Sequence, residues 1–338
     1  MNLRIGWRHH QLVVAIALIF VLTAILLGVV YGFQGASANG MLANLFFQSM
    51  GLLVISMITL LTGLVLHRPP SPFEFIRAHP FLRHKLRRLI RAVPILLAVS
   101  IFLPAFSALK SQVGRVYPYD WDQAFIDLDY AIHGTDPWRL LQPLIGYPVV
   151  TFAIAMAYQV WILLLYIMLP LLCVWISCRK LATQVLLTYL ISWIVIGAIL
   201  ANIFASVGPC FVEPFFGDDR FRPLMSYLQS VDRQYPLMFL DVQKSLMEWK
   251  LNNESELGRG ISAMPSMHVS IALIFFLATR RLSNWLGWLM GAFFVTILIG
   301  SVHTGYHYAV DGYAAIVVTL LIWYVSGILA QQFHRKTG

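Results

Sequence analysis

Long uninterrupted apolar runs are the feature that most constrains how this chain folds. A helix needs about 20 apolar residues to cross the hydrocarbon core of a bilayer. Eight runs near that length lie at about 11–33, 41–66, 92–109, 149–177, 184–206, 264–279, 285–304 and 311–333. Only 12% of the residues are charged, against about 25% in soluble domains. We therefore expect an all-α, polytopic integral membrane protein with about eight transmembrane helices.

The placement of the charges predicts the orientation of the chain. The net charge is +9, and cytoplasmic loops carry an excess of Lys and Arg. With the N-terminus inside, 15 of the 24 basic residues and a single acidic residue, Glu74, fall in the cytoplasmic segments. Those segments are 1–10, 67–91, 178–183, 280–284 and 334–338. This pattern predicts cytoplasmic N- and C-termini in a membrane resembling the bacterial inner membrane, and it favours anionic lipid over nucleic acid as the partner of the 67–91 loop.

The spans divide into two parts. Residues 1–91 form an N-terminal two-span extension with a basic cytoplasmic loop, and 92–338 form a six-helix catalytic domain. The run at 11–33 is too long for the apolar region of a signal peptide, so we expect an uncleaved helix. Two outer segments, 110–147 and 207–262, are long enough to cover a site on the outer face. Apolar residues at helical spacing within the first predict a short amphipathic helix at 124–132.

Ionisable residues concentrate at the outer ends of three spans. The segment Ser-Ala-Met-Pro-Ser-Met-His opens the sixth span at 262–268, and the segment 301–311 joins the seventh span to the eighth. Together they bring three histidines and one aspartate to the same membrane face. Because ionisable groups in membranes are costly, such a concentration predicts a functional site.

The spacing within these segments suggests a mechanism. His307 and Asp311 are four residues apart, so the carboxylate can orient the ring and leave its other nitrogen as a nucleophile. His268 arrives on another helix and suits a general acid. Pro265 and Ser266 are typical of a helix start, whose backbone N–H groups favour an anion. The residues therefore predict phosphoryl transfer through a phosphohistidine.

The same segments resemble a known family. Ser-x-Met-Pro-Ser-x-His at 262–268 and His-Tyr-x-x-Asp at 307–311 are similar to the second and third signature motifs of the phosphatidic acid phosphatase type 2 superfamily. The resemblance implies that His307 is the nucleophile, that Asp311 orients it and that His268 protonates the leaving oxygen. It also implies a lipid phosphate substrate and a reaction without a metal or other cofactor.

Features upstream resemble the inositol phosphorylceramide synthase branch of that superfamily. They are Lys110, the stretch Asp122–Asp129, Gly134-Thr135-Asp136-Pro137 and Gly208-Pro209. This branch transfers a phospho-head group to an acceptor hydroxyl, and the long outer segments suit the exclusion of water that transfer requires. The alternative is a lipid phosphate phosphatase, of the phosphatidic acid or polyprenyl phosphate type, with water as the acceptor.

The phosphate ligand is the point at which the chain departs from the phosphatase pattern. Ser301 stands where the third motif usually has arginine, and Arg222-Pro223 lacks the lysine of the first motif. Besides the helix start at Ser266, the candidate phosphate ligands are Arg259, Arg222, Arg220, Lys110 and His303. Arg259 is favoured because it lies close to the motif and arginine grips phosphate in a bidentate manner.

Two other functions use the same residues. His303, His307 and Asp311 are spaced four residues apart, so we expect His303 to share a helix face with His307. With His268 as a fourth ligand, these side chains could form a tetrahedral zinc site. That set predicts a zinc-dependent intramembrane lipid hydrolase. A transporter with a proton relay is the other alternative, but it needs charges deep within several spans, whereas these charges lie at one face.

Overall fold

The computed structural model describes residues 11–33, 38–176, 178–252 and 260–337, and these ranges contain helices and turns but no strand. The all-α prediction is confirmed. Seven helices within these ranges are long and apolar enough to cross a membrane. In chain order the long helices are α2 (Gln11–Tyr31), α3 (Ala38–His67), α5 (Pro80–Lys110), α8 (Pro148–Trp175), α9 (Arg179–Ser192) with its continuation through the π-helix η1 (Trp193–Leu200) and α10 (Ala201–Ile203), α15 (Asn284–His303) and α16 (Ala309–Thr337).

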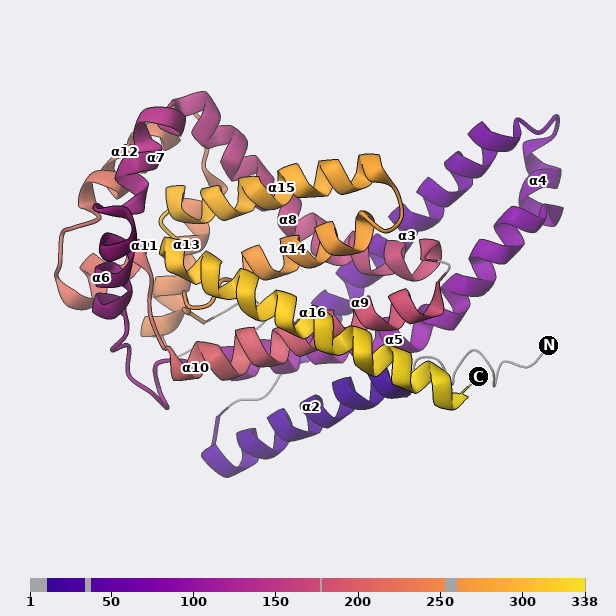
Figure 1. The fold of residues 1–338 in the computed structure, drawn as a ribbon, viewed down its shortest axis with the longest axis horizontal. Coiled ribbons are helices and arrows are strands. Elements are labelled where there is room, and N and C mark those ends of the chain that lie inside the picture. The colour runs from indigo at the N-terminus through magenta and orange to yellow at the C-terminus, as the bar shows by residue number, and fades with distance from the viewer. Residues whose placement is uncertain (1–10, 34–37, 177, 253–259, 338) are drawn as a thin grey trace.

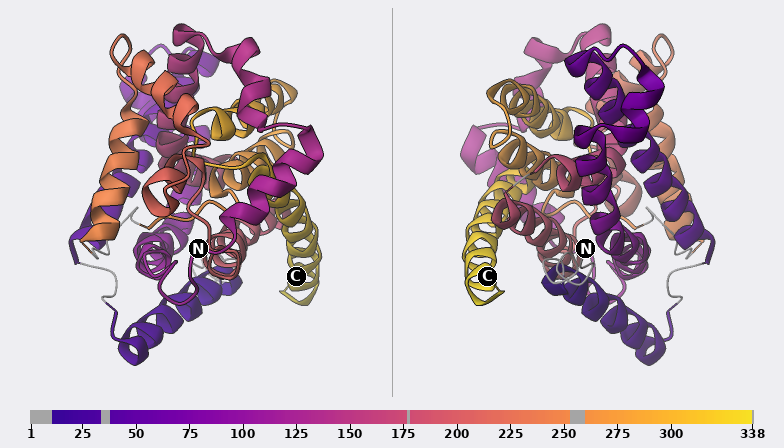
Figure 2. Two further views of the ribbon diagram at one scale, coloured as in Figure 1. Left: turned by 90° about the vertical axis from the view of Figure 1, so that its left-hand side faces the viewer. Right: turned by 90° about the vertical axis from the view of Figure 1, so that its right-hand side faces the viewer.

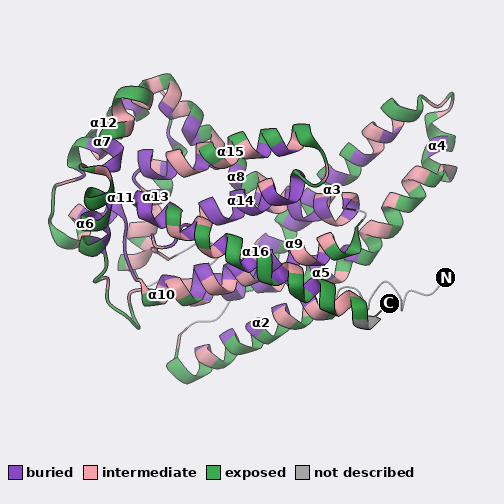
Figure 3. Cartoon of the chain, viewed as in Figure 1, coloured by how far each residue is buried: buried purple, intermediate pink, exposed green. Residues whose placement is uncertain are grey.

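The sixth apolar run forms a shorter helix, α14 (Met267–Thr279). Ser266 caps it, since the Ser266 hydroxyl accepts a bond from the Val269 N–H at 3.4 Å, so the predicted helix start is confirmed. Figure 3 shows α14 as the most thoroughly buried helix of the bundle. It packs against α8, α9, α15 and α16 and thus forms the centre of the molecule.

The short helices of the two long outer segments gather at one end of the bundle (Figure 1). They are α6 (Asp122–His133), α7 (Pro137–Ile145), α11 (Pro209–Phe216), α12 (Arg222–Asp232) and α13 (Met238–Leu251). The amphipathic helix predicted at 124–132 is confirmed by α6. The described ends of the chain and α4 (Pro72–Ala78) lie at the opposite end.

The N-terminal helices α2 and α3 pack on the outside of the bundle and expose much of their apolar surface (Figures 2 and 3). Helix α2 contacts α5, whereas α3 contacts both α5 and α8. Helix α5 begins at Pro80, well before the span expected at 92–109, because its charged first turns continue the helix beyond the apolar run.

Candidate active site

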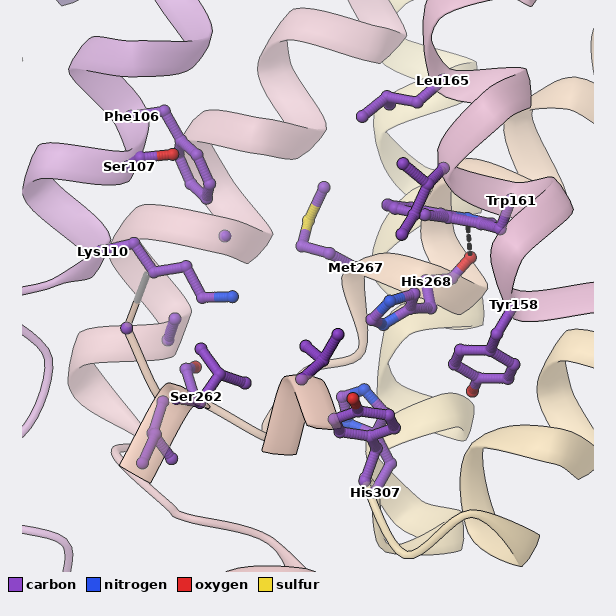
Figure 4. A pocket seen from close by; sticks show the side chains of 18 of the residues that line it. Phe106, Ser107, Lys110, Tyr158, Trp161, Leu165, Ser262, Met267, His268 and His307 are labelled. Carbon is purple, nitrogen blue, oxygen red and sulfur yellow. Dashed lines mark hydrogen bonds between the residues drawn. The ribbon is translucent and has the colours of Figure 1, made fainter. Parts of the chain in front are cut away.

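A cavity of about 300 Å³ lies between α5, α8, α13, α14 and the loop that joins α15 to α16. Figure 4 shows its centre, where side chains from distant parts of the sequence meet. Its polar and aromatic lining includes Lys110, Tyr158, Trp161, Ser262, His268, Tyr306 and His307. Two of the three predicted catalytic residues therefore lie on the cavity wall.

His307 is held at one ring nitrogen by two acceptors. Its Nδ1 lies 2.8 Å from the Ala263 carbonyl oxygen and 3.2 Å from Oδ2 of Asp311. Because a carbonyl oxygen only accepts, Nδ1 carries the proton and Nε2 keeps its lone pair. The arrangement supplies the tautomer that a nucleophilic histidine needs.

Asp311 connects this ring to the surrounding backbone. It is fully buried, and its Oδ2 also accepts the N–H of Tyr308 at 3.0 Å. Its backbone carbonyl accepts the N–H of Ser266 at 3.2 Å. The starts of α14 and α16 are thereby tied together, so that the two motif segments share one wall of the cavity.

His268 faces His307 from α14. The two ring centroids are 5.8 Å apart and the ring planes are inclined by 68°. Aromatic rings of Trp161 and Tyr158 pack beside His268 at centroid distances of 4.5 Å and 5.1 Å, and the Trp161 indole donates to the His268 carbonyl at 3.1 Å. The ring is thus fixed laterally, in an edge-to-face arrangement with His307, and both rings line the cavity.

Lys110 is the cation that lines the cavity among the described residues. It ends α5, and within the described ranges its amine makes no hydrogen bond, ion pair or cation–π contact (Figure 4). Its backbone is approached closely by Gly260, whose φ of +107° and lack of a side chain permit the contact. An anion in the cavity would give this amine a partner.

The other predicted phosphate ligands lie elsewhere. Arg222 is exposed, and it pairs with Glu213 at 2.8 Å and with Asp219 at 2.9 Å. These carboxylates raise the pKa of Arg222. Arg220 bonds Asp136 at 2.8 Å. Arg259 lies outside the described residues.

His303 does not share a helix face with His307, and that expectation is wrong. Helix α15 ends at His303, and the chain then turns through Gly305 at φ +73°, so the four-residue spacing is not helical here. His303 is buried with its Nε2 2.9 Å from the hydroxyl of Thr151, away from the cavity lining. The four side chains of the zinc hypothesis therefore do not converge, and the described residues contain no other cluster arranged to hold a metal.

Two buried carboxylates on α6 bind the segment that follows His307. Asp122 accepts the N–H groups of Val207 at 2.9 Å and Gly208 at 3.0 Å, and the Tyr308 hydroxyl at 2.7 Å. Burial raises the pKa of Asp122, although these three donors favour its charged form. Asp122 thereby connects the turn before α11 to the residue that follows His307.

Asp129 performs the same task about two turns further along α6. It accepts the N–H groups of Ala309 at 2.8 Å and Val310 at 2.9 Å, at the start of α16. A carboxylate there is favoured by the helix dipole, and burial nevertheless raises the pKa of Asp129. The sequence signal for this support is the presence of two aspartates on the same helix face as Phe125 and Ile126, where apolar residues are expected.

Comparison with known proteins agrees with this arrangement. A family model described as the PAP2 superfamily matches residues 123–325, well over half of the chain. The matched range includes His268, His307 and Asp311 but neither Lys110 nor the two N-terminal helices. Comparison with curated proteins and with solved structures found no match. Members of the PAP2 superfamily are phosphatases or phosphotransferases that act on lipid phosphates in membranes. The chain therefore belongs to the PAP2 superfamily.

Proposed function

We propose that this protein transfers a phosphoryl group, or a phosphate-bearing head group, from a membrane lipid to an acceptor hydroxyl through a phosphohistidine at His307. The observation that carries the proposal is the double acceptor at His307 Nδ1, at 2.8 Å and 3.2 Å, which leaves Nε2 as a free nucleophile beside the cavity. His268, Asp311 and Lys110 complete the machinery.

The first half-reaction forms the phosphoenzyme. Nε2 of His307 attacks the phosphorus and the bond to the leaving oxygen breaks, while His268 gives that oxygen its proton. Lys110 neutralises the phosphate oxygens. The Asp311 carboxylate stabilises the positive charge that develops on the His307 ring. No step requires a metal ion.

The second half-reaction returns the enzyme to its starting state. The acceptor hydroxyl loses its proton to His268 and attacks the phosphorus, and the bond to His307 breaks. Helix α13 supports an acceptor other than water, because Phe239, Val242 and Leu246 give one side of the cavity an apolar lining. Exclusion of water favours transfer over hydrolysis.

The decisive experiment uses the full-length protein in proteoliposomes with ³²P-labelled phosphatidic acid, polyprenyl phosphate and phosphatidylinositol. Transfer yields a new labelled lipid or glycan, whereas release of free phosphate would establish the phosphatase alternative. With a labelled aryl phosphate, whose leaving group needs no proton, His268→Ala should accumulate acid-labile label on the protein. If the His307→Ala protein still becomes labelled, His307 is not the nucleophile.

We also propose an orientation for the protein in the membrane. The cavity is lined in part by α13, which lies at the end of the bundle opposite the described ends of the chain (Figure 1). The basic loops support cytoplasmic termini and an active site facing the periplasm or exterior of a bacterial cell. Cys178, exposed at the start of α9, is a native probe, whereas Cys210 is buried. An impermeant thiol reagent should label Cys178 in right-side-out vesicles only after permeabilisation. Labelling of intact vesicles would reverse the orientation.

A further inference from the structure

Three proline residues interrupt the hydrogen bonding of the helices that form opposite walls of the cavity, Pro94 and Pro104 in α5 and Pro170 in α8, and the last two lie where α3 packs. Pro104 lies inside α5, four residues after Ser100, and Pro170 lies inside α8, four residues after Tyr166. Proline has no N–H, so the carbonyl groups of Ser100 and Tyr166 lose their helical partners. Each helix therefore carries a freed carbonyl at a point where it can bend.

Helix α3, from the N-terminal extension, meets both freed carbonyls. Asn44 is fully buried, and its side-chain amide donates to the Ser100 oxygen at 2.9 Å. Further along the same helix, Gly51 packs directly against the Tyr166 carbonyl, and a methyl group at Gly51 would collide with that oxygen. Thus α3 contacts both walls at the sites where their own hydrogen bonds are missing.

The bond from Asn44 contributes more to geometry than to stability. Among the described residues the Asn44 Oδ1 has no hydrogen-bond partner, so burying this amide leaves an unsatisfied acceptor. Such an acceptor costs about as much as one good hydrogen bond contributes. What the amide does supply is a fixed donor beside Ser100.

Pro104 is the point about which the last part of α5 can turn. Lys110 follows Pro104 on the same helix, and Leu103, Phe106 and Ser107 share its face on the cavity. A small rotation of this last part of the helix moves the Lys110 amine relative to His268 and His307.

We propose that α3 positions the phosphate site and that Asn44 is its positioning residue. By bonding the carbonyl that Pro104 frees, Asn44 sets the bend of α5 and thereby the place of the Lys110 amine. The N-terminal extension is then part of the catalytic apparatus. This inference rests on the role of Lys110 in the proposed function.

The test compares Asn44→Leu with wild type in the full-length protein in proteoliposomes. We expect KM for the lipid phosphate donor and the inhibition constant of inorganic phosphate to rise together by roughly tenfold, the factor for losing about one charge-assisted hydrogen bond. The control is Thr59→Val, which removes another buried polar group from the same face of α3 and should leave both constants unchanged.

Two further variants make the test specific. Pro104→Ala restores the N–H that Ser100 lacks, so Asn44→Leu should have a smaller effect in that background. In a Lys110→Met background, Asn44→Leu should add nothing. If Asn44→Leu lowers the Tm but leaves the KM and the inhibition constant unchanged, the positioning role of Asn44 is wrong and the proposed function still stands. If Lys110→Met leaves both constants unchanged, Lys110 does not bind the phosphate, and the positioning role of Asn44 is wrong as well.

Discussion

The two sides of the loop before α16 use buried aspartates in different ways. On the cavity side Asp311 contacts an imidazole ring, at 3.2 Å from Nδ1 of His307. On the far side Asp122 and Asp129 accept six hydrogen bonds from four amide N–H groups and a tyrosine hydroxyl in other elements, because one N–H bonds both oxygens of Asp122. All three are almost completely buried. Burial alone therefore does not distinguish the carboxylate proposed to be catalytic from the two that bind backbone, and the imidazole partner of Asp311 is the difference between them.

The largest effect should come from the ring on the cavity side. His307→Ala removes the nucleophile, so turnover should fall by more than about a thousandfold while the protein still folds. The loss is measured as the rate of turnover and as the amount of labelled phosphate trapped on the protein. His133→Gln, a histidine on α6 that bonds Tyr313, is the matched control and should keep its turnover.

Asp311→Asn should produce the next largest loss. The Ala263 carbonyl still holds the Nδ1 proton, but the charge that stabilises the ring is gone, so kcat should fall by about a hundred- to a thousandfold. KM should change little. A kcat within tenfold of wild type would mean that Ala263 alone orients His307.

Asp122→Asn should affect stability instead of chemistry. An amide cannot accept from all three donors, and leaving one buried group unsatisfied costs about 1–3 kcal/mol. Thermal unfolding in lipid should show the loss, while the folded fraction keeps a kcat within about tenfold. The control is Asp127→Asn, because Asp127 lies on the exposed face of α6. A large loss of kcat in folded Asp122→Asn would show that Asp122 affects the chemistry as Asp311 does.

The smallest effect should come from substitution of Arg222, which the sequence predicted as a candidate phosphate ligand. Exposed ion pairs contribute little to stability, so Arg222→Gln should leave stability and KM almost unchanged. A severalfold rise in KM would show that the phosphate reaches Arg222 and would move the binding site toward α12.

Local sequence patterns were sufficient to predict the long helices and one contact of the candidate site. Apolar runs of membrane length predicted the long helices. The four-residue spacing predicted the contact between His307 and Asp311, although α16 begins at Ala309 and His307 precedes it. The same spacing argument failed for His303, because Gly305 turns the chain after α15 and no helix connects the two histidines.

Contacts between distant segments could not be predicted in this way. Lys110 was one candidate among five, and nothing local placed the end of α5 opposite His268. The bond from Asn44 to Ser100 depends on how α3 packs against α5, which apolar patterning leaves open because both helices are apolar on several sides.

The shortness of α14 has a consequence for how substrates arrive. Its 13 residues extend about 20 Å, against about 30 Å for the hydrocarbon layer. We expect Arg280 and Arg281 to anchor its far end at one surface, which would put His268 about 10 Å beneath the opposite one. A phosphate must sink out of the head-group plane to react, so thickening the bilayer should slow the enzyme even when every side chain is intact.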